Sequence, residues 1–206
     1  MAHDPQIIST YPQRRQLVWL KRDLRLTDHP ALHAALLGGP VLCVYVIEPE
    51  LVAAPDFDAQ HWHFIRESLL ELRQAIYQRG GALCIRTGGA VQTLNELVAK
   101  HGIAGLWSHE ETGTGLTFSR DRAVAKWAHQ AGVTWQELPQ NGVVRRLRDR
   151  DGWSALWESR MRAPQFPAPE QVSTWLTAAE RDALIREPIP TAKELGLSGG
   201  KRQNQK

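Results

Sequence analysis

Five short apolar runs alternate along the chain with longer amphipathic stretches, and this alternation restricts the fold more than any other feature. The runs cover residues 16–20, 41–47, 82–86, 103–107 and 133–138, and each is short enough to be a buried strand. Between them, one stretch carries an apolar stripe at helical spacing, formed by Trp62, Ile65, Leu69, Leu72 and Ile76. We therefore expect an α/β fold. It is a Rossmann-like five-stranded parallel sheet in the strand order 3-2-1-4-5, with helices on both faces.

The ends of the predicted helices carry recognisable signals. Asp28 is expected to cap the first helix, because its side chain can accept a hydrogen bond from a free N–H of the first turn. Pro30 fits that turn because its missing N–H is not needed there. Glycines predict where the four helices stop, at positions 38, 80, 102 and 132.

Composition divides the chain into three parts. Residues 1–15 are polar and include two prolines, so we expect a flexible lead-in. Residues 16–140 contain the five runs and form the expected α/β domain. Residues 141–206 are expected to be an interdomain linker and a truncated tail with short helices. This tail should be mostly irregular, because five of the twelve prolines fall at positions 164, 167, 169, 188 and 190.

Two short helices are predicted within this Pro-rich tail. The first runs from Trp153 to Met161, and Trp153 and Trp157 share one of its faces because they are four residues apart. That apolar face either packs back on the α/β domain or docks something outside the chain. Thr177 and Glu180 have the spacing of a capping box, which predicts the second helix.

Charge and cysteine content exclude several classes of protein. The net charge of +3 and the isoelectric point of about 9.1 tolerate a polyanionic partner without requiring one. Cys43 and Cys84 lie inside apolar runs, so we expect core cysteines in a reducing cytoplasm rather than a disulfide framework. No apolar segment approaches the roughly 20 residues that a membrane helix needs. We expect a cytoplasmic protein without a membrane partner.

The two most polar loops of the predicted domain follow the first and fourth strands. Ligands of open α/β sheets bind beyond the carboxyl ends of the strands, where the strand order reverses, and the order 3-2-1-4-5 places that point between these two strands. Lys21 and Arg22 supply positive charge there, and Asp23 and Glu110 supply hydrogen-bond acceptors. These four are the candidate cofactor-binding residues, suited to a planar polar chromophore or a nucleotide. The alternative is that Asp23 pairs with Arg25 or caps a helix.

Common catalytic and metal-binding motifs are missing from the sequence. Gly113 and Gly115 lack the third glycine of G-x-G-x-x-G, and no G-x-x-x-x-G-K-[ST] occurs. His61 and His63 are two residues apart on a predicted helix, so their side chains point in different directions and do not chelate one metal. The position of His109 shows no ligand spacing either. We therefore predict neither a catalytic residue nor a metal site.

Several stretches resemble a known family. Trp19-Leu20-Lys21-Arg22-Asp23-Leu24-Arg25 with Asp28-His29-Pro30-Ala31-Leu32 is similar to the opening signature of the N-terminal α/β, antenna-binding domain of the DNA photolyase/cryptochrome family. Leu20, Lys21 and His29 stand where that family often has Phe, Arg and Asn. Less specific similarities follow in the same order along the chain, at residues 64–69, 110–111, 120–121 and 141–153.

The resemblance implies a domain that can hold an antenna chromophore, which passes excitation energy to FAD. Folate-binding members often carry a glutamate three residues before an Arg-Asp pair, and here Thr117 stands three residues before Arg120. A deazaflavin or a flavin is therefore expected rather than a folate. Relatives have a second, helical domain that binds FAD and receives the DNA lesion. FAD and DNA are expected only through such a domain, which is missing from this chain or separately encoded.

The implied function is the antenna-side α/β domain of a photolyase/cryptochrome-like blue-light flavoprotein, which repairs pyrimidine dimers or senses light. Full-length relatives include deoxyribodipyrimidine photo-lyase. This chain is expected to lack the catalytic FAD domain and to be inactive alone. The alternative is a stand-alone nucleotide-binding or signalling module of the same architecture. The missing phosphate-binding loops count against that alternative.

Overall fold

A computed structural model describes residues 14–140, 142–145 and 149–197 of the chain. The predicted lead-in lies outside the described residues except for positions 14 and 15. Within the described residues, no helix is both long and apolar enough to cross a membrane.

The predicted α/β sheet is confirmed. Its five strands are β1 (Gln16–Leu20), β2 (Val41–Ile47), β3 (Leu83–Thr87), β4 (Gly105–His109) and β5 (Thr134–Leu138). All neighbouring strands are parallel, and their order is β3-β2-β1-β4-β5. The central strand β1 is buried along its whole length. Val18 of β1 pairs with Cys43 on one side and with Trp107 on the other, so β1 and β4 end side by side.

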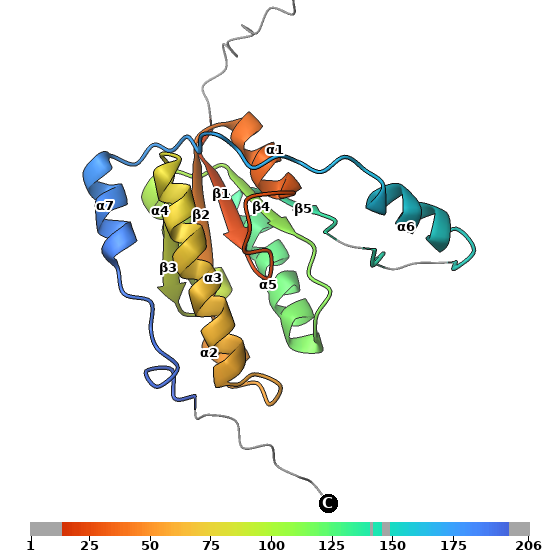
Figure 1. Cartoon of the computed structure of the whole chain (residues 1–206), viewed down its shortest axis with the longest axis horizontal. Helices are drawn as coiled ribbons and strands as arrows, with labels where there is room; N and C mark the ends of the chain where they lie inside the picture. Colours follow the sequence, from red (N-terminus) through yellow and green to blue (C-terminus); the bar gives the residue numbers. More distant parts are fainter. Residues whose placement is uncertain (1–13, 141, 146–148, 198–206) are drawn as a thin grey trace, which may run out of the picture.

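Helices cover both faces of this sheet (Figure 1). On one face, α1 (Pro30–Gly38) and α3 (Ala59–Gln78) pack on alternate strand residues, among them Val18, Leu20 and Cys43. On the other, α4 (Ala90–His101) and α5 (Gly115–Ala131) pack on the residues between, among them Leu17 and Trp19. A short α2 (Pro49–Val52) follows β2. Two apolar cores therefore hold the sheet from its two sides.

Two local predictions were wrong. His29, not Asp28, caps α1, because its Nδ1 accepts the backbone N–H of Leu32 at 3.0 Å, while Asp28 has a φ of 52°. The fourth strand begins two residues later than predicted, at Gly105, because Ile103 still bonds back to the preceding helix through its N–H. This shift makes His109 the last residue of β4, and its side chain lies on the face that α1 covers.

Both helices predicted in the Pro-rich tail are present. They are α6 (Trp153–Met161) and α7 (Ala178–Arg186), and Thr177 and Glu180 form the predicted capping box of α7. Figure 1 shows α6 standing apart from the sheet, whereas the chain around α7 runs beside α3.

Candidate functional site

Two cavities open at the carboxyl ends of the strands. The larger has a volume of about 790 Å³ and lies between the ends of β1 and β2 and the helices α2 and α3. The smaller has a volume of about 340 Å³ and lies between the loops that follow β1 and β4. The two cavities share four lining residues, which are Lys21, Arg22, Arg25 and Glu111. They therefore adjoin one another at the point where the strand order reverses.

The two cavities differ in chemistry. The larger one is lined by aromatic and aliphatic side chains together with a few charged ones, including Tyr45, Leu51, Phe57, Trp62, Ile65 and Glu48. The smaller one is lined almost entirely by polar and charged residues, including Glu110 and Gln140. The larger cavity therefore offers the apolar surface against which a flat ring can pack.

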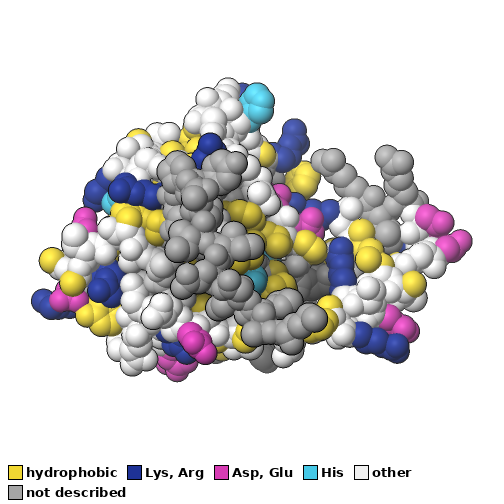
Figure 2. Space-filling view, turned by 90° about the horizontal axis from the view of Figure 1, so that it is seen from above, with side chains coloured by type: hydrophobic (Ala, Val, Ile, Leu, Met, Phe, Trp, Pro, Cys, Tyr) yellow, Lys and Arg dark blue, Asp and Glu magenta, His cyan; other side chains and the backbone are white. Residues whose placement is uncertain are grey.

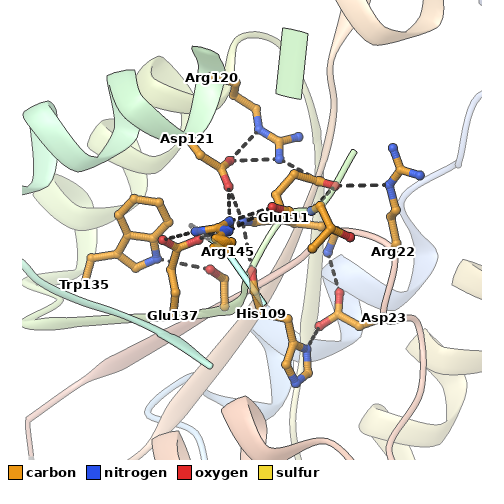
Figure 3. Close-up of polar contacts among 12 residues, drawn as sticks. Arg22, Asp23, His109, Glu111, Arg120, Asp121, Trp135, Glu137 and Arg145 are labelled. Carbon is orange, nitrogen blue, oxygen red and sulfur yellow. Dashed lines mark hydrogen bonds and ion pairs between the residues drawn. The ribbon is translucent and has the colours of Figure 1, made fainter. Parts of the chain in front are cut away.

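Arg120, from the second turn of α5, holds three carboxylates beside the cavities, and Figure 3 shows its contacts with Glu111 and Asp121. Its guanidinium lies 2.8 Å from Glu48, 3.1 Å from Glu111 and 2.9 Å from an oxygen of Asp121. All four side chains are largely buried. Buried charges are stable only when each has a partner, and here one guanidinium pairs with two acids from loops and one from α5. Arg120 therefore fixes the loops after β2 and β4 relative to α5.

Lys21 takes part in the same network of ion pairs and hydrogen bonds. Its Nζ lies 2.9 Å from Asp121 and donates a hydrogen bond of 3.0 Å to the carbonyl of His109. It also lies 4.5 Å from the ring centre of Trp19, close enough for a cation–π contact. Burial lowers the pKa of Lys21, and the carboxylate of Asp121 opposes that effect. Lys21 lines both cavities, yet most of its hydrogen-bonding capacity is used within the protein.

Arg22 is held less tightly than Lys21. Its side chain is 66% exposed, and its Nε lies 3.5 Å from Glu111. The turn at Gly113 lets the guanidinium approach, because a Cβ there would stand 2.7 Å from Nη2 of Arg22. A partly exposed guanidinium beside both cavities is well placed to bind an anionic group of a ligand.

Asp23 lies beneath the site rather than in it. Its side chain is almost fully buried between the end of β4 and the start of α1. One carboxylate oxygen lies 2.5 Å from Nδ1 of His109 and 3.0 Å from Nε2 of His29, and the other accepts the N–H of Lys21 at 2.7 Å. Burial alone would raise the pKa of Asp23, but the imidazoles of His109 and His29 hold it well below its usual range. The carboxylate thus joins the loop after β1 to β4 and α1.

Asp23, His29 and His109 are also close enough together to be considered as metal ligands. The hydrogen bond from Leu32 to Nδ1 of His29 argues against that role. An imidazole that accepts at Nδ1 carries its proton on Nε2 when neutral, and a protonated nitrogen has no lone pair for a metal. The sequence-based expectation that the chain has no metal site remains a prediction.

The four candidate residues selected from the sequence therefore do not all line the same cavity. Lys21 and Arg22 line both cavities, Glu110 lines the smaller one, and Asp23 lines neither. The alternative pairing of Asp23 with Arg25 does not occur, because the guanidinium of Arg25 donates to the carbonyls of Thr27 and Asp28.

Sequence reasoning missed most of the larger cavity and two of the three carboxylates around Arg120. Glu48 and Asp121 come from parts of the chain that only the fold brings together. The Arg120-Asp121 pair could have been selected, because it stands in one of the stretches that carried the family resemblance. Nothing in the sequence marked the aromatic lining supplied by Phe57 and Trp62 as a cavity wall.

Comparison with protein families supports the fold and its place in a family. Residues 16–150 match the model of the DNA photolyase family. The chain is 32% identical over 200 residues to chicken (Gallus gallus) cryptochrome-2, an alignment that covers 89% of this chain and 34% of that protein. It is 34% identical over 120 residues to a deoxyribodipyrimidine photo-lyase of Agrobacterium fabrum, covering 57% of this chain and 24% of that protein.

Solved structures show the same arrangement of strands and helices. A bacterial class III photolyase from Agrobacterium tumefaciens superposes with a TM-score of 0.66 at 23% identity, covering 83% of this chain and 37% of its own. An archaeal photolyase from Sulfolobus tokodaii, solved with two FAD molecules, superposes with a TM-score of 0.64 at 22% identity, covering 88% and 40%. The chain thus spans two fifths or less of the length of these relatives.

Proposed function

This chain belongs to the DNA photolyase family, and from that membership we propose that it is the antenna-side α/β part of a photolyase- or cryptochrome-like blue-light flavoprotein. In this proposal it holds a light-absorbing chromophore in the larger cavity. The photochemistry on DNA or in signalling belongs to an FAD-binding domain outside these residues, and the chain is inactive alone.

The observation that carries the proposal is the larger cavity. Its volume of about 790 Å³ lies within the usual range of roughly 300–1,000 Å³ for small-molecule sites. It opens at the carboxyl ends of the strands, where open α/β sheets bind ligands, and it adjoins the smaller cavity at the point where the strand order reverses. Tyr45 and Phe57 offer aromatic surface for a flat ring, and Arg22 offers charge at the edge of the cavity. Size, position and lining together fit a ring system with a polar side chain.

The chain's own residues would hold the chromophore, whose contribution is to absorb light. Arg22 binds an anionic or carbonyl group of its side chain, and Glu110 accepts hydrogen bonds in the smaller cavity. Lys21 contributes positive charge from within the Arg120 network. Asp23 acts indirectly, because it positions the loop that carries Lys21 and Arg22.

We infer that this chromophore is a deazaflavin or a flavin rather than a folate. Thr117 replaces the glutamate of folate-binding relatives, and its hydroxyl donates to the carbonyl of Thr114. Thr117 also lines the larger cavity, so the exchange changes that wall directly. The Sulfolobus tokodaii photolyase, whose two FAD molecules imply a novel light-harvesting cofactor, supports a flavin as the second chromophore.

Titration of the purified chain tests the proposal. FMN, FAD, a deazaflavin and a methenylated folate are added separately, and binding is followed by visible absorbance and ligand fluorescence. We expect one equivalent of a flavin or deazaflavin to bind and the folate to bind more weakly. Ser68→Trp, which fills part of the larger cavity, should abolish binding. Arg22→Ala should weaken it about tenfold, the effect of one charged hydrogen bond.

The matched control is Arg122→Ala, which removes an exposed arginine of α5 outside both cavities. Failure of all four compounds to bind would contradict the proposal. Tight binding of ATP or AMP without any flavin would favour the stand-alone nucleotide-binding module instead.

A further inference from the structure

The larger cavity contains two polar groups that the protein itself leaves unused. They are the hydroxyl of Tyr45, on β2, and one carboxylate oxygen of Glu48, which directly follows that strand. Figure 2 views the opposite end of the molecule, at the amino ends of the strands, where charged and apolar side chains of the described residues are interspersed. The cavity differs from that surface, because it sets a few polar groups among apolar walls, as ligand sites do.

The hydroxyl of Tyr45 is free to bond a ligand. Tyr45 lies on the face of the sheet that α1 and α3 cover, and among the described residues its hydroxyl has no hydrogen-bond partner. The polar side-chain atoms of the described residues that are both fully buried and unpartnered belong to His29 and His109, so the Tyr45 hydroxyl remains accessible. Burial raises the pKa of Tyr45, and the carboxylate of Glu48 raises it further. The phenol therefore keeps its proton at neutral pH and can donate a hydrogen bond into the cavity.

Glu48 uses only one of its two oxygens within the described protein. Its Oε1 accepts a hydrogen bond of 2.8 Å from Arg120, whereas Oε2 has no hydrogen-bond partner among the described residues. The side chain is only 10% exposed, and the ion pair with Arg120 fixes its orientation. A buried carboxylate oxygen without a partner is a strong acceptor for an N–H group of a ligand.

Together the two groups offer one donor and one acceptor to a ring that enters the cavity. The hydroxyl of Tyr45 can donate to a carbonyl, and Oε2 of Glu48 can accept from an N–H. The imide edge of a flavin or a deazaflavin has this pattern, because its N–H lies between two carbonyls. A pterin has an amino group in place of one of these carbonyls, and its two adjacent N–H donors match a carboxylate with both oxygens free. Arg120 already holds one oxygen of Glu48.

We propose that Tyr45 and Glu48 recognise the imide edge of the chromophore, with Glu48 accepting its N–H and Tyr45 donating to a neighbouring carbonyl. This inference rests on the proposed function and adds the residues that determine which ring is bound. The rest of the ring packs on apolar side chains such as Leu51, Phe57 and Ile65. A ring without the N–H leaves a buried acceptor unpaired, which is how a hydrogen-bonding site rejects an analogue.

Lumiflavin and lumiflavin methylated at its imide nitrogen test the role of Glu48. Neither compound has the long polar side chain of FMN, so Arg22 does not contribute to the comparison. In fluorescence titrations the wild-type chain is expected to bind the methylated compound at least about tenfold more weakly than lumiflavin. Glu48→Gln should bind lumiflavin about tenfold more weakly and lose most of this preference, because its amide oxygen faces Arg120 and its NH₂ faces the ligand N–H. Equal binding of the two compounds by the wild type would overturn the proposal, and this comparison needs no variant to fold.

Tyr45→Phe tests the other half of the proposal, because it keeps the ring and removes only the hydroxyl. Binding of lumiflavin should weaken about fivefold, and a carbonyl stretching band of the bound flavin should move to higher frequency in infrared difference spectra. A merely structural role of Tyr45 would not move that band. The matched control is Tyr77→Phe, which removes a phenol hydroxyl that bonds to Asp182 outside both cavities. An unchanged carbonyl band in Tyr45→Phe would overturn the role of its hydroxyl.

Failure of this inference and failure of the proposed function give different results. Tight binding of both lumiflavins with equal affinity overturns the recognition of the imide edge and leaves the proposed function intact. Absence of any flavin or deazaflavin binding overturns both.

Discussion

The two halves of the Pro-rich tail contain one short helix each, but only one of these segments packs on the α/β domain. The segment around α7 returns to the domain and buries four side chains in its cores, at Val172, Leu176, Ile189 and Ala192. The segment around α6 buries none of its helix. Composition does not separate these segments, because each mixes prolines, charges and apolar residues. The difference shows that the α7 segment packs into the cores of this domain, whereas the α/β domain leaves the side chains of α6 exposed.

Backbone carbonyls explain how the α7 segment is fixed. Trp62 of α3 donates from Nε1 to Pro190, and Arg73 donates to Glu187, at 3.0 and 2.5 Å. Arg66 reaches the carbonyl of Ile189. The backbone carbonyls of this irregular segment are not paired in a helix or a sheet. Three long side chains of α3, those of Trp62, Arg66 and Arg73, donate hydrogen bonds to them. Because Trp62 also lines the larger cavity, the α7 segment supports a wall of the candidate site.

Replacing Val172 should lower the free energy of unfolding most. It tests directly whether the α7 segment is part of the domain's core. Val172 is almost fully buried against Gly81, where even a Cβ would not fit. Val172→Asp buries a carboxylate without a partner and should lower the free energy of unfolding by at least about 3 kcal/mol. Urea unfolding followed by circular dichroism measures this. A loss under about 1 kcal/mol would show that the α7 segment does not belong to the domain's core.

Asp23→Asn should cause the second largest loss of stability, because it removes a buried charge that two imidazoles and a backbone N–H surround. We expect a loss of about 2–3 kcal/mol at pH 7. The folded pKa of Asp23 lies below its unfolded value. This carboxylate therefore stabilises the fold above the unfolded pKa and loses that effect as the pH falls toward the folded pKa.

Urea unfolding of both proteins from pH 7 to pH 3 checks this dependence. The gap between wild type and Asp23→Asn should narrow below about pH 4, near the unfolded pKa of an aspartate. Glu71→Gln, an exposed carboxylate of α3, is the control and should keep a constant, small offset. A gap that stays the same across the range would contradict the pairing of Asp23 with the two histidines.

Trp62→Phe should cause a moderate loss of stability, which measures how much the contact with the α7 segment contributes. It removes the hydrogen bond to Pro190 and part of a buried side chain, at a cost of about 1–2 kcal/mol. Trp127→Phe is the matched control, because its indole bonds to Asn95 near the surface of α5. Equal losses in the two variants would mean that the contact with Pro190 adds nothing.

Trp157→Ser should have the smallest effect on the isolated chain, within about 0.5 kcal/mol, as for surface substitutions in general. The exposed position of Trp157 on α6 is the reason. Thermal unfolding monitored by near-ultraviolet circular dichroism reports the change. A loss comparable to that of Val172→Asp would mean that α6 packs on the domain after all and would remove the contrast between the two segments.

Much of the fold could be predicted from the sequence, because its signals are local. Apolar runs, helical stripes and terminal glycines define the elements, and the family resemblance supports their order. Both tail helices were also predictable, through the spacing of Trp153 and Trp157 and the capping box at Thr177 and Glu180. Whether each helix packs on the domain depends on distant partners, so the sequence left that open for α6.

The candidate site was less predictable for the same reason. Lys21 and Arg22 could be chosen because they follow β1 directly. The role of Asp23 depends on His109, which is 86 residues away in sequence, and on the two-residue shift of β4 that orients that histidine. The larger cavity is formed by α3 and the end of β2, and no motif marks it.

A crystal structure of the chain with bound FMN or deazaflavin tests the central claim most directly. We predict that the ring system lies in the larger cavity, against Tyr45 and Phe57, with its side chain toward Arg22. A ring bound elsewhere on the chain, or a larger cavity filled only by solvent at saturating ligand, would contradict it.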